Sequence, residues 1–256
     1  MRHHLLASAA ALACLSVAFP AMSQSDEGLW NGFYVGANAG VTTGTMKNSL
    51  HVERPAGSIL IPPADLAALN TPVSTGHSNR TGFTGGIEGG YDYRMGNFLV
   101  GVETDFGFMD IKKTNSNTYQ SRLLINPPVT YTLENRQKAD WIWTVRPRIG
   151  YIWGPWLFFG SAGFGLSEIK ITTTYHDTFT PPGSASMSDS ATKAGFAGGL
   201  GVGYAFSPKW SFKGEWVYTD FGSVHATTTS SNGDATIVAE GKVKANLIRL
   251  GVDYRF

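Results

Sequence analysis

The stretch that decides the fold is Leu247-Ile248-Arg249-Leu250-Gly251-Val252-Asp253-Tyr254-Arg255-Phe256. The even-numbered side chains from Ile248 to Phe256 are apolar or aromatic, and the odd-numbered ones between them are charged or glycine. A period of two places each set on its own face of a β-strand. Because the apolar face ends in aromatics, the pattern favours a sheet with lipid outside and polar side chains inside. Such a strand must pair with the first strand to close a barrel.

The same alternation recurs in seven earlier segments. Across all eight, the proposed outward face carries no Lys, Arg, Asp or Glu. A cationic side chain at the bilayer midplane costs about 2–4 kcal/mol, so a lipid-facing surface requires this absence. The sequence therefore predicts an all-β fold, an eight-stranded antiparallel transmembrane β-barrel. The earlier strands are expected at residues 32–43, 83–93, 98–108, 141–151, 156–166, 195–204 and 210–218.

Short and long connections alternate along the chain. By the rule for such barrels, the three short turns and both termini are periplasmic, and the four long loops are extracellular. We expect the strands to extend past the membrane as hairpins that turn at residues 126–128 and 231–234, with one or two helical turns at 62–70. The short turns are Arg94-Met95-Gly96-Asn97, Trp153-Gly154-Pro155 and Ser207-Pro208-Lys209, and the long segments are residues 44–79, 110–139, 170–193 and 222–242.

Aromatic side chains fall at two levels of this barrel. Two aromatic girdles are typical of amphipathic rings at two membrane interfaces, whereas a soluble barrel would point its large side chains inward. The girdle toward the short turns comprises Tyr91, Tyr93, Phe98, Tyr151, Trp153, Trp156, Tyr204, Phe206, Trp210, Tyr254 and Phe256. The girdle toward the long loops comprises Phe106, Phe108, Trp141, Trp143, Trp216 and Tyr218.

The N-terminal segment is typical of a secretory signal. A weakly basic start precedes an apolar run from Leu5 to Phe19, and small residues follow at Ala21 and Ser23. The run is short for a membrane-spanning helix, which needs about 20 residues. We expect cleavage after Ser23, so that residues 1–23 are a signal peptide and residues 24–256 form the barrel domain.

The single cysteine, Cys14, lies inside this signal, so the exported chain is expected to hold no disulfide. A lipoprotein is the alternative, but Ala11-Leu12-Ala13 is a poor lead-in to processing at Cys14. Loss of Arg2 with the signal takes the formal net charge from +1 to zero. Without a basic stripe, the sequence gives no indication of nucleic-acid binding.

Several motifs carry a resemblance to a known family. They are Trp30-Asn31-Gly32-Phe33-Tyr34-Val35-Gly36-Ala37-Asn38-Ala39-Gly40, Gly89-Gly90-Tyr91-Asp92-Tyr93, Gly101-Val102-Glu103-Thr104-Asp105, Arg148-Ile149-Gly150-Tyr151, Glu215-Trp216-Val217-Tyr218 and Tyr254-Arg255-Phe256. Over essentially the whole exported chain, the sequence resembles the immunogenic, OmpA-type outer-membrane β-barrel proteins of alphaproteobacteria, often labelled porin family. Pro147 departs from the family pattern, because proline donates no ladder bond, and predicts a bulge.

The resemblance implies an outer-membrane protein and surface antigen that contributes to envelope integrity and surface interactions. Its implied partners are outer-membrane lipid and lipopolysaccharide, and a host or envelope surface ligand bound through the loops. It also implies that the barrel assembly machinery recognises a terminal aromatic signature, here Tyr254 and Phe256. A small-pore porin that passes small hydrophilic solutes is the alternative function.

Inward-facing charges are the candidate site. Eight-stranded barrels have interiors that side chains just fill, so these charges must pair with each other or with trapped water. One hypothesis is a solvated structural salt-bridge network. The other is a gate, in which breaking pairs of Glu88 or Glu103 with Arg146 or Arg148 opens a narrow water path. The predicted network is Glu88, Glu103, Asp105, Arg146, Arg148, Lys213, Glu215 and Arg249, with Asp92, Asp253 and Arg255 also inward.

Catalysis and ligand capture compete with these hypotheses. The histidines of the exported chain, His51, His77, His176 and His225, all lie in predicted loops without metal-ligand spacing, and no nucleophile motif precedes them. The sequence therefore predicts no enzyme, no cofactor and no catalytic or metal-binding residue. Binding of a metal or haem by these histidines is the alternative, against four solvated loop side chains.

Overall fold

The computed structural model describes residues 28–53, 78–120, 129–178, 182–229 and 236–256. The predicted signal peptide and its cleavage site lie outside these residues. So do the helical turns expected at 62–70 and the hairpin turns expected at 126–128 and 231–234.

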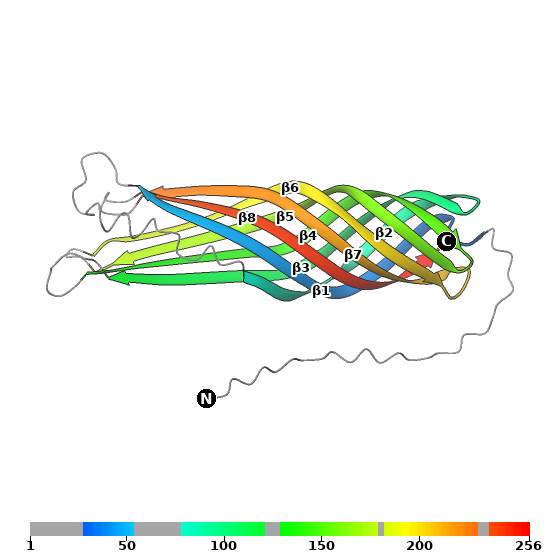
Figure 1. Ribbon diagram of the computed structural model, residues 1–256, viewed down its shortest axis with the longest axis horizontal. Helices are drawn as coiled ribbons and strands as arrows, with labels where there is room; N and C mark the ends of the chain where they lie inside the picture. Colours follow the sequence, from blue (N-terminus) through cyan, green and yellow to red (C-terminus); the bar gives the residue numbers. More distant parts are fainter. Residues whose placement is uncertain (1–27, 54–77, 121–128, 179–181, 230–235) are drawn as a thin grey trace, which may run out of the picture.

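Eight antiparallel strands form a closed barrel in which each strand pairs with its neighbours in sequence and β1 pairs with β8 (Figure 1). This confirms the predicted all-β barrel. The β1–β8 ladder runs from Tyr34 opposite Arg255 to Glu53 opposite Thr236. The strands are β1 (Gly32–Glu53), β2 (Ser78–Met95), β3 (Phe98–Gln120), β4 (Thr130–Trp153), β5 (Trp156–Asp177), β6 (Ser184–Ala205), β7 (Trp210–Thr229) and β8 (Thr236–Arg255).

The two ends of the barrel differ. At one end, here called the turn end, short turns join β2 to β3, β4 to β5 and β6 to β7, as predicted. Gly96 (φ 62°) and Gly154 (φ 56°) occupy the left-handed region in the first two turns, a conformation that glycine adopts without strain. Every strand is longer than the predicted membrane segment and extends toward the opposite, loop end, also as expected.

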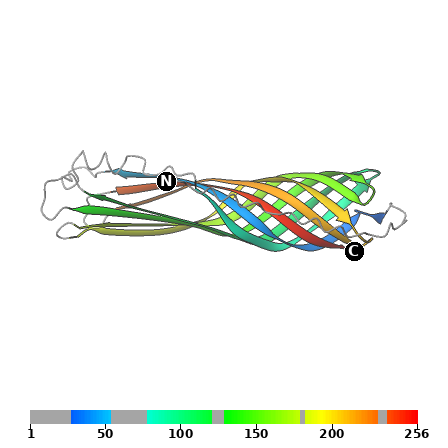
Figure 2. The same cartoon turned by 60° about the horizontal axis from the view of Figure 1, so that its bottom comes forward.

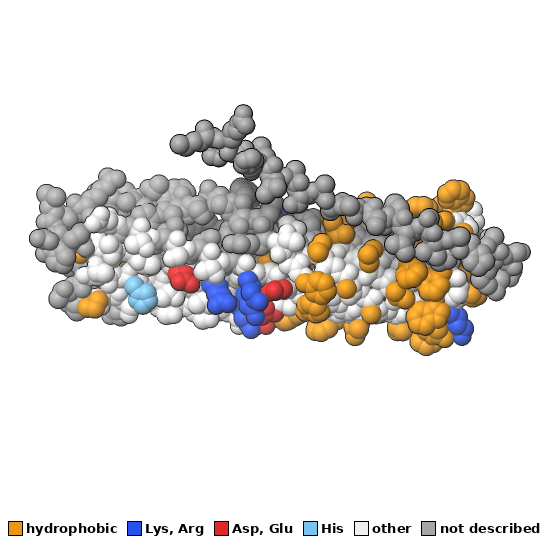
Figure 3. Space-filling model, turned by 90° about the horizontal axis from the view of Figure 1, so that it is seen from below, with side chains coloured by type: hydrophobic (Ala, Val, Ile, Leu, Met, Phe, Trp, Pro, Cys, Tyr) orange, Lys and Arg blue, Asp and Glu red, His pale blue; other side chains and the backbone are white. Residues whose placement is uncertain are grey.

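The exterior carries an apolar belt next to the turn end. Leu250 (73 % exposed), Ile87 and Leu200 point outward here, although large apolar side chains normally avoid solvent. Figure 3 shows hydrophobic side chains gathered over one half of the molecule, with charged side chains just beyond them. Aromatic rings touch within both predicted girdles, as in Trp156–Tyr204 and Phe106–Trp141. The belt matches the lipid-facing surface expected from the sequence.

Beyond the belt lies what we call the loop half, where the barrel changes character. Register shifts mark its start, between Phe108 and Ile111 in β3 and between Ala139 and Ile142 in β4. Described β2–β3 pairs stop at Thr84–Met109 and described β6–β7 pairs stop at Phe196–Asp220. The other ladders continue, so the strands part into two groups at the loop end (Figure 2).

The bulge predicted at Pro147 is wrong. Pro147 pairs with Val102 of β3 in regular register. Toward β5, the described pairs skip from Val145–Phe164 to Arg148–Ser161 without a register shift. Because proline lacks the N–H group, it interrupts a ladder on one side without adding a residue to the strand.

The interior consists of three layers. The turn-end layer is apolar and surrounds Trp30, whose ring packs where a side chain on Gly203 would collide with it. The middle layer is charged. The loop-half layer is again apolar. The turn-end layer contains Trp30, Leu99, Ile152, Leu157 and Phe159, and the loop-half layer contains Met109, Ile111, Ala139, Ile142, Ile169, Ile171, Val217, Phe221, Val243, Ala245 and Leu247.

Candidate functional site

The middle layer, here called the charge layer, brings together all eight residues that the sequence placed in an interior network. Their side chains alternate inward from five strands, and the facing strand β6 contributes small residues such as Gly199 and Gly201, which leave room for them. The layer is buried rather than solvated. Its members are Glu88, Asp92, Glu103, Asp105, Arg146, Arg148, Lys213, Glu215, Arg249, Asp253 and Arg255, each at most 6 % exposed.

Arg146 lies at the centre of the layer and is fully buried. Its Nη2 atom lies 2.7 Å from Glu103 Oε1, 3.0 Å from Asp105 Oδ2 and 3.3 Å from Glu215 Oε2. The guanidinium fork suits such multiple carboxylate contacts. A single cation therefore ties β4 to β3 beside it and to β7 across the barrel.

Glu103 is the most heavily contacted carboxylate. Besides Arg146, its oxygens meet Arg148 Nη1 at 3.0 Å and Lys213 Nζ at 2.8 Å. Tyr34 donates its hydroxyl hydrogen to Glu103 Oε2 at 2.7 Å. Both carboxylate oxygens of Glu103 thus find donors, which offsets the cost of burying the charge.

The two remaining arginines extend the layer toward each end. Arg249 contacts Asp105 Oδ1 at 2.8 Å and also pairs with Glu215, toward the loop half. At the turn end, Arg255 Nη2 lies 2.9 Å from Asp92 Oδ2. The Arg255 guanidinium also lies 5.7 Å from the centre of the Trp30 ring, which joins the charge layer to the turn-end apolar layer.

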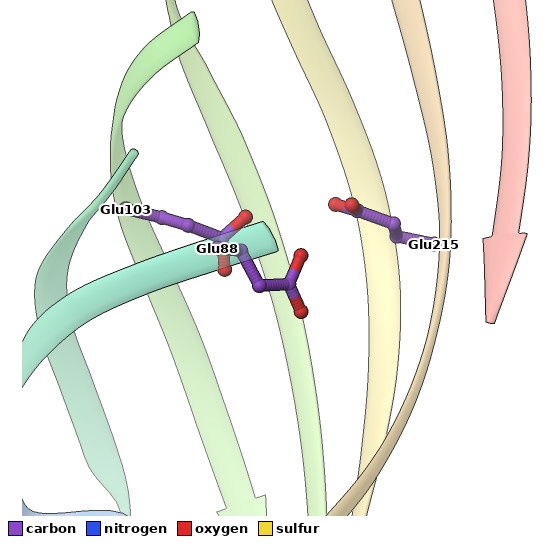
Figure 4. A group of neighbouring side chains, drawn as sticks. All are labelled: Glu88, Glu103 and Glu215. Atoms are coloured by element: carbon purple, nitrogen blue, oxygen red, sulfur yellow. The ribbon is translucent and has the colours of Figure 1, made fainter. Parts of the chain in front are cut away.

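Three glutamates come close enough to suggest a metal site. One carboxylate oxygen from each of Glu88, Glu103 and Glu215 lies within 4.8 Å of the others (Figure 4). However, Lys213 Nζ lies 2.7 Å from Glu88 Oε1, and arginines bind the other two carboxylates. Side-chain cations therefore already pair with these three glutamates, and the arrangement is an ion-pair network.

The partners differ in part from those considered in the gate hypothesis. Glu103 does pair with both Arg146 and Arg148, but the described ion pair of Glu88 is with Lys213. Sequence reasoning missed the uncharged members of the layer, Tyr34 and Asn38, which hydrogen-bond to Glu103 and Glu88. Their signal was present, because both occupy inward positions in the alternation of the first strand.

The other singled-out residues lie away from the charge layer. Tyr254 points outward at the turn end, with its ring 5.3 Å from that of Phe256 and 5.0 Å from that of Trp210. Phe256 is 73 % exposed. Of the four histidines, only His176 has a described side chain, and it is exposed in the loop half of β5.

Exterior ion pairs on β3, β4, β5, β7 and β8 follow the apolar belt where the loop half begins, and we call these the rim pairs. They join residues two apart on one strand, or neighbouring strands, and their side chains are exposed or half-exposed. Short distances join Asp110 to Lys112 (2.8 Å), Asp140 to Lys138 (2.7 Å), Glu168 to Lys170 (3.5 Å) and Asp220 to Lys244 (2.9 Å). This abrupt change in exterior polarity marks the edge of the surface that lipid can cover.

Asp220 occupies a bend of β7 among the rim pairs. Its Oδ1 atom accepts the N–H of Gly222 (3.1 Å), a glycine with φ 69° at a register shift between β7 and β8. Partial burial raises the pKa of the Asp220 carboxyl, but the hydrogen bonds from Lys244 and Gly222 outweigh it and leave that pKa below its usual value. Hydrogen bonds to Tyr218 and Asp220 raise the pKa of Lys244.

Comparisons with known proteins identify the family of this chain. Residues 7–256 match the family described as outer membrane protein beta-barrel domain. The 31 kDa outer-membrane immunogenic protein of Brucella melitensis is 29 % identical over 93 % of this chain and 88 % of its own length. The 22 kDa outer membrane protein of Rhizobium leguminosarum is 27 % identical over 56 % of this chain and 54 % of its own. The crystal structure of OprG from Pseudomonas aeruginosa aligns over 91 % of this chain and all of its own, with 13 % identity and a TM-score of 0.45. Within the described residues, no helix is long and apolar enough to span a membrane.

Proposed function

Since the chain belongs to the outer membrane protein β-barrel family and resides in the outer membrane, we propose that it is a closed structural barrel and surface antigen. In this proposal it stabilises the envelope and presents its loop half to the surroundings. The turn end faces the periplasm, by the rule that short turns do so in such barrels. The proposal assigns the chain no catalytic step and no cofactor, in keeping with the expectation from the sequence.

The observation that carries this proposal is the order of the interior layers. The charge layer lies between two apolar layers whose side chains are 5 % exposed or less. A water path would have to cross both, and hydrated ions do not enter tightly packed apolar constrictions readily. The ion pairs of the charge layer then act as internal braces between strands rather than as a lining for transported solute.

The small-pore alternative and the gate hypothesis make a different claim about the same layer. They require Glu103 to exchange its partners Arg146 and Arg148 and the apolar layers to open as well. Because each of these groups is held by several short contacts, opening would expose multiple uncompensated charges at once. This cost supports the closed barrel.

Single-channel recording of the refolded protein in planar bilayers tests the proposal. We expect no conductance steps from the wild type. As a control, the double variant Leu99→Gly, Leu157→Gly thins the turn-end layer while leaving the loop-half layer intact, and should stay silent as well. Reproducible steps from the wild type would contradict the closed barrel and favour the porin.

The rim pairs support contact with lipopolysaccharide as one partner. Lys112, Lys170 and Lys244 project outward directly above the apolar belt, at the level expected for phosphorylated lipid headgroups. Their carboxylate partners hold these ammonium groups in place. We propose that the lysines exchange or share these carboxylates with headgroup phosphates, an effect that higher salt should weaken.

The closing strand supports a role in assembly. β8 completes the barrel by pairing with both β7 and β1, and an unclosed sheet would leave unsatisfied backbone groups in lipid. The half-buried Tyr254 and the exposed Phe256 place two aromatic rings against each other at the end of that strand. We propose that they form the signature that the barrel assembly machinery recognises. Phe256→Ala should slow insertion in cells but permit refolding in micelles, as judged by heat-modifiable gel mobility.

A further inference from the structure

The charge layer is not balanced. Among the described residues it holds six carboxylates and five cations, and every carboxylate except Asp253 has an ion-pair partner. Asp253 is 4 % exposed and forms no ion pair within the described part of the chain. The excess of one negative charge is therefore located at one buried side chain.

Asp253 belongs to a regular arrangement over three neighbouring strands. Gly36 of β1 pairs with Glu88 on one side and with Asp253 on the other. Two residues further along β1, the inward-facing Asn38 pairs with Gly86 of β2 and with Gly251 of β8. Side chains that carry oxygen therefore alternate with glycines. We call this arrangement the glycine recess; it comprises Gly36, Asn38, Gly86, Glu88, Gly251 and Asp253.

Oxygen atoms without hydrogen-bond donors gather in this recess. Asn38 is turned toward it, because its Nδ2 atom donates to Glu88 Oε2 at 2.8 Å. That leaves Asn38 Oδ1 buried without a hydrogen-bond partner in the described structure, and Asp253 Oδ1 is in the same state. The Asp253 and Glu88 carboxyl groups lie within hydrogen-bonding reach of each other. Two neighbouring carboxyl groups and a buried amide oxygen without a donor thus belong to one recess.

The glycines make this convergence possible. A Cβ atom on Gly36 would overlap Asp253 Oδ1. A Cβ atom on Gly251 would lie 3.1 Å from Glu88 Oε1 and 3.4 Å from Asn38 Cβ, tighter than ordinary packing. Side chains at these two positions would therefore displace the oxygens, whereas glycine lets the oxygens approach the backbone.

We propose that the glycine recess binds a monovalent cation. Oxygen atoms from carboxylates and amides are the ligands that hard cations such as alkali and alkaline-earth ions prefer. A buried carboxylate needs a counter-charge, and here the deficit is one positive charge, which a monovalent ion supplies and a divalent ion exceeds. Lys213 pairs with Glu88 and Glu103, so the ion binds on the Asp253 side of Glu88. This site does not depend on whether the barrel conducts.

Cation-dependent stability tests the proposal. The full chain refolded in detergent micelles is unfolded with urea in NaCl, in KCl or in N-methylglucamine chloride at the same ionic strength. We expect Na⁺ or K⁺ to raise the unfolding midpoint above the midpoint in N-methylglucamine chloride. At cation concentrations well above the dissociation constant, a tenfold increase in cation concentration should lower the unfolding equilibrium constant about tenfold.

Two variants of matched chemistry assign the effect to the recess. Asp253→Asn removes the unpaired charge while keeping the shape, and should abolish the difference between the salts. Glu215→Gln neutralises a carboxylate that arginines already pair, and should retain the difference although it weakens the layer. Equal midpoints in all three salts for the wild type, or an unchanged difference in Asp253→Asn, would overturn the proposal. Stability that responds to pH but not to the cation would also overturn it, because a proton then supplies the charge.

A second measurement needs no variant. Crystals of the wild-type protein grown with Tl⁺, a heavy substitute for K⁺, should show an anomalous peak within coordination distance of Asp253 and Asn38. A structure in which Lys213 instead turns to pair with Asp253, with no peak in the recess, would overturn the proposal.

Discussion

In the belt half of the barrel the exterior is apolar and the interior charged, whereas in the loop half the exterior is polar and the interior apolar. Strand β8 shows the reversal: Leu250 points outward and Arg249 inward, but further along Lys244 points outward and Val243 inward. The strand geometry is the same in both halves. The surrounding medium therefore decides which face is apolar, lipid in one half and water in the other.

The reversal explains how one chain closes its interior. Lipid around the belt forces polar residues inward, where they form the ion pairs of the charge layer. In water the strands can bury apolar side chains between them, as in a soluble protein. The two arrangements meet at the rim pairs and at the register shifts in β3, β4 and β7. If this comparison is correct, equivalent substitutions in the two halves must have unequal effects.

The largest effect is expected inside the belt half. Arg146→Met removes a fully buried cation that contacts three carboxylates and should destabilise the barrel by about 3–5 kcal/mol. Lys170→Met in the loop half is the control, because its exterior ion pair with Glu168 is partly exposed and should change stability little. Urea unfolding in lipid vesicles measures both. Similar losses for the two variants would refute the contrast between interior and exterior charges.

A new exterior charge should separate the halves almost as strongly. Leu250→Lys places an ammonium group on the apolar belt and should cost about 2–4 kcal/mol in a bilayer. Thr172→Lys adds the same group to an outward position of β5 in the loop half and should be nearly neutral. The measurement is again urea unfolding in vesicles. If Leu250→Lys unfolds at the same urea concentration as the wild type, lipid does not cover the belt.

The sequence alone predicts much of this comparison but not its reversal. Strict alternation in the belt half identifies the strands, their faces and the inward charges, because lipid tolerates no exception at Leu250 or its neighbours. In the loop half the pattern is weaker, since polar exterior residues resemble those of ordinary loops. Ile169 and Ile171 alternate with Lys170 in the sequence, yet only the structure shows that they face a packed interior.

Ion-pair partners were also beyond sequence reasoning. Arg146 and Glu215 are 69 residues apart, and they meet because the barrel closes with a particular stagger between strands. The residue pattern within a single strand does not specify that stagger. The same limit applies to Pro147, where a local rule predicted a bulge but the register on both sides holds.

A conservative change in the apolar interior should have an intermediate effect. Ile171→Val deletes one buried methylene group from the loop-half layer and should destabilise by about 0.5–1.5 kcal/mol. Ile149→Val makes the same change on the apolar belt, where the side chain is 63 % exposed to lipid, and should cost well under that amount. Equal costs, from unfolding curves of the two variants, would mean that the loop half is not packed as a water-excluding core.

The smallest effect concerns Asp220, an exterior charge at the boundary between the halves. Because hydrogen bonds from Lys244 and the Gly222 N–H leave its pKa below the unfolded value, the carboxylate stabilises the folded barrel above the unfolded pKa of about 3.9. That contribution must disappear as pH falls below about 4 and through the folded pKa. Asp220→Asn should therefore lower the unfolding midpoint slightly at pH 7, and the difference from the wild type should shrink toward pH 3. Interior carboxylates titrate in both proteins, so only the difference reports Asp220. A difference that grows on acidification would show that Asp220 is held protonated, contrary to its contacts with Lys244.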